Sequence, residues 1–85
     1  MDIYDFIEKI ETKKDFDIFL EMLLNNLRNN ETDWENNNLE NYVDGIYGFT
    51  GSLNGYYMHR NENINLEKPT WKMIATILVA ARNHE

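Results

Sequence analysis

Cysteine is absent from this 85-residue sequence, and histidine, serine and proline are scarce. Without cysteine the chain forms no disulfide and offers no thiolate as nucleophile or metal ligand, which fits a reducing compartment. The two histidines, His59 and His84, lie far apart in the sequence, so no metal-binding spacing is present. Ser52 is the only serine, and its neighbours do not form the pattern of an activated nucleophile. We therefore expect no enzyme, no metal site and no cofactor.

Long apolar runs are also missing. The longest, residues 77–81, falls far short of the about 20 residues that cross a bilayer. The opening residues MDIYDF lack the basic and apolar regions of a signal peptide. These observations predict one cytoplasmic domain over residues 1–85 that makes no membrane contact.

Positive charge is in short supply. The chain has 15 Asp and Glu against 8 Lys and Arg, a net charge of -7. Residues 1–44 hold 12 of the 15 acids and only four bases, and residues 29–44 hold five acids and no base. Direct binding of nucleic acid needs clustered Lys and Arg and is not indicated. The acidic half is either a solvated surface or a face that attracts a basic protein partner.

The strongest acidic stretch surrounds the sequence Trp34-Glu35-Asn36. If this stretch binds a partner, the predicted contact residues are the acids and the asparagine that lie in it. These are Glu31, Asp33, Glu35, Asn36, Glu40 and Asp44.

Helical periodicity dominates the first half of the chain. Apolar residues spaced by three and four predict a short helix over about residues 2–11 and a long one over about 14–29. Thr12 and Asp15 form a capping box ahead of the long helix. A third period begins at Leu39, after three asparagines that suit a helix N-cap, and continues to Leu53.

The second half contains one more helix. Asn54-Gly55 predicts a turn, and residues 54–68 show no helical period, so we expect an irregular loop there. Pro69 fits the first turn of a last helix that is apolar nearly all round, which is typical of a central helix. Its predicted buried face is Trp71, Ile74, Ala75, Leu78 and Ala81. The predicted fold is an all-α, compact four-helix domain with an irregular loop over residues 54–68.

Two features of the third period leave alternatives open. Gly45, Gly48 and Gly51 recur within it, which indicates close approach of another helix, fraying into a loop, or backbone contact with a ligand. Trp34 either closes the open end of the helical bundle or faces a partner. In the first case Glu35 and Asn36 bind free backbone groups near the helix start; in the second they present an interaction surface.

Several segments resemble a family of small bacterial and phage proteins of unknown function. The shared segments are W-E-N-x-x-L at residues 34–39, G-Y-Y at 55–57 and P-x-W at 69–71, followed by a helix with paired alanines at 80–81. The resemblance covers about residues 14–85 and implies a small helical fold without an assigned activity.

The function expected from these observations is a non-catalytic, acidic protein-interaction module, such as an inhibitor or immunity-type partner of a larger bacterial toxin or defence protein. One alternative is a mimic of nucleic acid that blocks a DNA- or RNA-binding protein. Another is a small-molecule pocket lined by Tyr42, Tyr47, Tyr56, Tyr57 and Trp71.

Overall fold

The computed structural model describes residues 2–30 and 33–84, and over those residues the chain is helical with no strand. Five helices follow one another: α1 Ile3–Ile7, α2 Lys13–Asn29, α3 Leu39–Gly51, α4 Leu53–His59 and α5 Trp71–Ala80. The all-α class is confirmed. The predicted number of four helices is not matched, because an additional helix, α4, forms in the segment that was expected to be an irregular loop.

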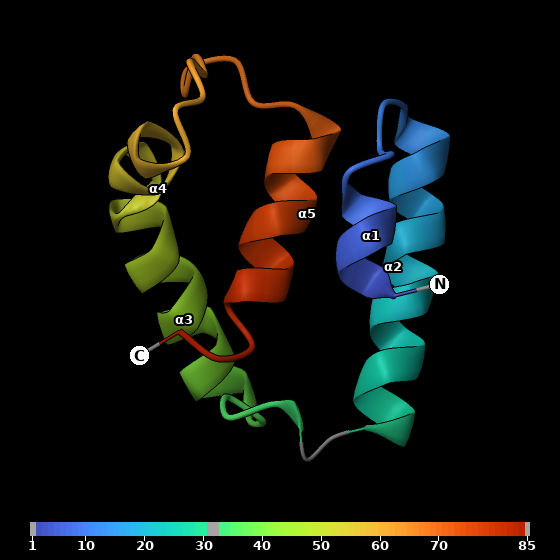
Figure 1. The fold of residues 1–85 in the computed structure, drawn as a ribbon. Coiled ribbons are helices and arrows are strands. Elements are labelled where there is room, and N and C mark those ends of the chain that lie inside the picture. Colours follow the sequence, from blue (N-terminus) through green and yellow to red (C-terminus); the bar gives the residue numbers. More distant parts are fainter. Residues whose placement is uncertain (1, 31–32, 85) are drawn as a thin grey trace.

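The last helix is central, as its apolar character predicts. α5 packs against α1, α2 and α3. In Figure 1, α1 and α2 lie on one side of α5, and α3 and α4 lie on the other. α2 and α3 do not pack directly against each other over their described lengths. The two long helices are therefore held in place through α5.

Side-chain caps fix where four helices begin. At α1 the Asp2 carboxylate accepts from the Tyr4 backbone N–H. The Thr12 hydroxyl accepts from the Asp15 backbone, and the Asp15 carboxylate accepts from the backbone N–H groups of Glu11 and Thr12. Those bonds lower the pKa of Asp15, with the Glu11 N–H as the largest cause. Asn38 caps α3. Thr70, and not Pro69, precedes α5 as its cap, so the proline lies just outside the helix.

The helix α4 occupies part of the predicted loop. Asn54 and Gly55 were expected to form a turn, yet both lie inside α4. Leu53 and Tyr57, one helical turn apart, are buried with Phe49 of α3 in the same cluster. Burial of this apolar face outweighs the local turn preference of Asn-Gly. The irregular loop is therefore shorter than predicted and covers residues 60–70, with Asn61 at φ 58.

One further boundary and one burial differ from expectation. The first helix ends at Ile7 and not near residue 11, although Ile10 is still buried beyond it. Trp71 was predicted on the buried face of α5 but is 38% exposed. Trp71 is the first residue of α5, and its ring packs against that of Phe16 with the two ring centroids 5.2 Å apart. Trp34, in contrast, is buried, as the bundle-closing interpretation requires.

One glycine of the repeated three is explained by close packing. A Cβ atom at Gly45 would lie 2.5 Å from the carbonyl oxygen of Ala81 and 2.9 Å from Nδ2 of Asn36. The end of α5 therefore approaches the backbone of α3 more closely than any side chain permits. At Gly51 a Cβ meets nothing within 4 Å, so packing does not require glycine there.

A buried arginine follows the end of α5. Arg82 is 5% exposed, and its guanidinium donates to Asn26 Oδ1 at 2.8 Å, to the Tyr4 hydroxyl at 2.7 Å and to the Val79 carbonyl at 3.1 Å. Asn26 Oδ1 also accepts from Trp34 Nε1 at 2.7 Å. One amide oxygen thus joins α2, the segment that carries Trp34, and the chain end after α5.

The described helices also bear on membrane contact. Within residues 2–30 and 33–84, none combines the length and the apolar character that crossing a bilayer demands.

The Gly45 contact makes a stability prediction. Gly45→Ala should lower the free energy of unfolding by about 1–3 kcal/mol, because overpacking against a backbone carbonyl forces α3 and α5 apart. The matched control is Gly55→Ala inside α4, where a Cβ meets nothing within 4 Å. That variant should gain about 0.5–1 kcal/mol from reduced backbone entropy. Thermal unfolding measures both, and a Gly45→Ala protein as stable as Gly55→Ala would refute the close approach.

The shared acceptor makes a second prediction. Asn26→Ala leaves the Trp34 indole and the Arg82 guanidinium without their acceptor, which should cost about 2–4 kcal/mol in urea unfolding. Asn25→Ala is the control, since Asn25 is the exposed neighbour on the same helix. Asn26→Asp retains an oxygen for both donors and should keep most of the stability at pH 7. Equal stability of the two alanine variants would show that the shared acceptor does not hold the fold.

Candidate functional site

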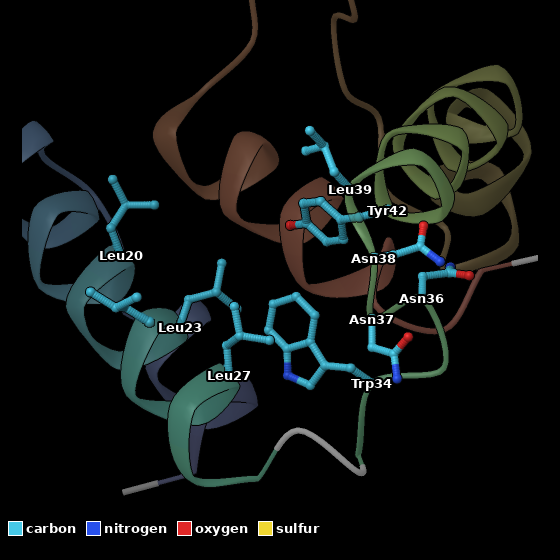
Figure 2. Close-up of a pocket in the computed structure, with 10 residues that line it drawn as sticks. Leu20, Leu23, Leu27, Trp34, Asn36, Asn37, Asn38, Leu39 and Tyr42 are labelled. Atoms are coloured by element: carbon cyan, nitrogen blue, oxygen red, sulfur yellow. The ribbon is translucent and has the colours of Figure 1, made fainter.

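A groove of about 400 Å³ lies between α2 and α3. Leucines of α2 form one wall, the start of α3 forms the other, and the segment 33–38 closes one end (Figure 2). The groove exists because α2 and α3 pack on α5 and not on each other. Its lining residues are Leu20, Leu23, Leu24, Leu27, Trp34, Asn36, Asn37, Asn38, Leu39 and Tyr42.

Two aromatic rings form the rigid part of the groove. Trp34 and Tyr42 lie with ring centroids 5.4 Å apart, and both face the leucines of α2 in Figure 2. The Tyr42 hydroxyl donates to the Leu78 carbonyl of α5 at 2.8 Å. Burial raises the pKa of Tyr42, although nearby Arg82 opposes the shift. The hydroxyl is therefore a neutral donor and a structural anchor.

The outer walls of the groove are apolar and open to solvent. On α2, Leu20 is 39% exposed and Leu24 is 45% exposed. On α3, Leu39 lines the groove and is 80% exposed, and Val43, one turn further along, is 52% exposed and lines an adjoining hollow with Ile46 and Tyr47. These four side chains form two aliphatic rows, one on each helix. Within each row the two residues are one helical turn apart. Large aliphatic side chains gathered around a concavity mark an interaction surface more often than scattered exposed ones do.

Charge is distributed unequally along the two walls. On α3, helical spacing places Glu40 and Asp44 in the row next to Leu39 and Val43, on the side away from α5. Both acids are exposed, and no base lies between residues 29 and 44. We call Glu40 and Asp44 the acidic rim. On α2 the corresponding row is mixed in charge, because Asp17 and Glu21 are accompanied by Lys13 and Arg28. Lys13 and Asp17 form an exposed ion pair at 2.7 Å.

The predicted contact residues fall into three groups. Asp33, Glu35, Glu40 and Asp44 are exposed on the segment before α3 or on α3 itself, so all four are accessible to a partner. Asn36 is half-buried, and its amide nitrogen donates to the carbonyls of Ala81 and His84. Glu31 lies outside the described residues.

The prediction that Glu35 and Asn36 bind free backbone groups near the helix start is met only in part: Asn36 binds backbone carbonyls, but beyond the end of α5 and not at the start of α3. Asn36 binds carbonyls at the end of α5, and its own backbone N–H donates to the Arg82 carbonyl at 2.8 Å. The Glu35 backbone N–H donates to Asn83 at 3.2 Å. The start of α3 is capped by Asn38 alone, which leaves its neighbours free to fasten the chain end. Glu35 and Asn36 of the WEN segment therefore bind the residues that follow the C-terminus of α5.

The two aliphatic rows were not identified as exposed from the sequence, because interaction residues were predicted by their charge. The period of α2 assigned Leu20 and Leu24 to the core together with Leu23. One feature of the sequence could have indicated that these leucines are exposed. The apolar face of α2 is wide and borders directly on Asp17 and Glu21, with no small polar residues between. Leu39 and Val43 likewise belong to the apolar positions of the third helical period.

The predicted five-aromatic pocket is not formed. Tyr42 lines the groove, Tyr47 is 80% exposed on α3, and Trp71 lies against Phe16. Tyr56 and Tyr57 contact each other edge to face in α4, with Phe49 against Tyr56. The five rings were grouped by type, whereas the fold distributes them over separate faces. In the described part of the chain, no three His, Asp or Glu side chains converge as a metal site requires.

Comparison with known proteins gives one result. No curated protein and no solved structure matches the sequence. The model of one protein family, described as a family of unknown function (DUF7660), matches residues 12–85. That match includes α2 to α5, and therefore the described residues that form the groove. The chain belongs to this family of unknown function.

Proposed function

We propose that the protein is a non-catalytic interaction module that docks a protein partner with a basic surface on the groove between α2 and α3. The observation that carries the proposal is the combination of exposed aliphatic rows and the acidic rim on one wall. Apolar area supplies affinity, and the rim supplies attraction and orientation. The net charge of -7 extends that attraction to longer range.

The arrangement favours a protein partner over mimicry of nucleic acid. A mimic needs carboxylates in phosphate-like rows across its binding face. Here the acids Glu40 and Asp44 border a row formed by Leu39 and Val43, and aliphatic side chains have no counterpart in a phosphate backbone. A docked protein can cover both kinds of side chain.

The biological setting that fits such a module is the bacterial or phage-infected cytoplasm. A small acidic domain there suits the role of an inhibitor or an immunity-type partner of a larger toxin or defence protein. In that role the domain blocks a basic surface by occupying it, and it needs no catalytic group of its own.

The proposal predicts that binding depends on the rim and on salt. A partner captured from the native host should bind Glu40→Gln/Asp44→Asn about tenfold more weakly at 50 mM salt, because two attractive charges are lost. Wild-type affinity should fall as salt rises, and the double variant should respond less steeply. Calorimetry or surface plasmon resonance measures both quantities.

The matched control is Glu11→Gln/Glu67→Gln, which removes the same net charge. Glu11 precedes α2 and Glu67 precedes α5, and both segments lie at the opposite end of the molecule from segment 33–38 (Figure 1). This control should bind like wild type apart from a small uniform loss. Equal weakening by the two double variants, or affinity that ignores salt, would reject the proposal.

A further inference from the structure

We infer that the occupant of the groove is a single amphipathic α-helix of the partner, with an apolar face and one basic flank that faces α3. This inference rests on the proposed function and specifies which element of the partner docks. It follows from the shape, the apolar spacing and the charge asymmetry of the groove.

The shape fits a helix. α2 and α3 are each packed on α5, so the space between them is bounded by two helical walls and closed at one end by segment 33–38. The leucine row of α2 runs from Leu20 to Leu27, about 10 Å at about 1.5 Å per residue. A helix of roughly two to three turns covers that length. Seated there it packs side by side with α2 and α3, as in a helical bundle.

The exposed rows have the spacing that a helix contacts. Leu20 and Leu24 lie one turn apart on the α2 wall, and on α3 Leu39 lines the groove with Val43 one turn further along, in the adjoining hollow. A helix with apolar residues at i, i+3 or i+4, and i+7 inserts them between these rows. An extended segment would leave its own backbone N–H and C=O groups facing aliphatic walls, without partners.

The charges on the two walls indicate which flank of the bound helix is basic. They also argue against a second copy of this chain as the occupant. The acidic rim of Glu40 and Asp44 follows the α3 wall, so Lys or Arg on the facing flank is favoured. The α2 wall is mixed in charge, so the other flank of the occupant is polar without a required sign. A second copy carries the same charge of -7, which opposes pairing of two acidic faces.

The test is selection of random 16-residue peptides displayed on phage against the full-length protein, followed by binding of the selected peptides in solution. Enriched sequences should show apolar residues at i, i+3 or i+4, and i+7 with Lys or Arg on one flank. On titration, amide shifts in a ¹H–¹⁵N spectrum should concentrate in α2 and the first turns of α3. Enrichment without a helical period, or no enrichment, would overturn the inference.

Matched variants locate the binding. Leu24→Ser/Leu39→Ser should weaken the selected peptides at least tenfold. Ile18→Ser/Met58→Ser is the control, because those side chains are similarly exposed, at 42% and 67%, outside the groove. All four positions are exposed, so folding should survive in both double variants. Equal binding to the two would overturn the inference.

The native partner separates this inference from the proposed function. If Glu40→Gln/Asp44→Asn weakens the partner but Leu24→Ser/Leu39→Ser does not, the helix in the groove is wrong and the acidic docking surface stands. If neither double variant weakens it, both are wrong. Sedimentation equilibrium provides a third result: a dimer that Leu39→Ser dissociates would assign the groove to a second copy and overturn the inference.

Discussion

The guanidinium of Arg82 is buried, and its hydrogen bonds to groups of three helices hold those helices in position. A charge removed from water is costly unless hydrogen bonds replace its hydration. Here the described acceptors are neutral groups from α1, α2 and α5, and the ring faces of Tyr4 and Trp34 lie within 5.5 Å and 5.9 Å of the guanidinium carbon. These contacts fix the chain end after α5, and Asn36 fastens segment 33–38 to the same end.

The groove follows from this constraint. Since segment 33–38 is attached to the end of α5, α3 must start beside α5 and not beside α2. Further along α3, the absence of a side chain at Gly45 permits α3 and the end of α5 to stay in close contact. α2 is held separately, through Asn26 and through Phe19 in the core. The leucines on the near sides of α2 and α3 are consequently left facing each other across open space.

Sequence reasoning predicted what depends on local periodicity and caps. The long helix and its Thr12–Asp15 capping box follow from short-range hydrogen bonds and were confirmed, and of the three asparagines that suited a cap before Leu39, Asn38 is the one that caps α3. It failed where distant residues compete with local preference. Packing of Leu53 and Tyr57 overrode the Asn54-Gly55 turn, and the approach of α5 decided that Gly45, but not Gly51, needs to be glycine. The groove could not be predicted, because periodicity identifies an apolar face without saying how much of it a neighbour covers.

The central claim is that the aliphatic rows of α2 and α3 stay open in the free protein. Solvent paramagnetic relaxation of methyl signals, with a neutral gadolinium complex in solution, tests this directly. Leu24, Leu39 and Val43 should be strongly broadened, whereas Leu23, only 8% exposed on the same face of α2, should be protected. Protection of Leu39 and Val43 equal to that of Leu23 would mean that the groove is closed or already filled, and would contradict the account.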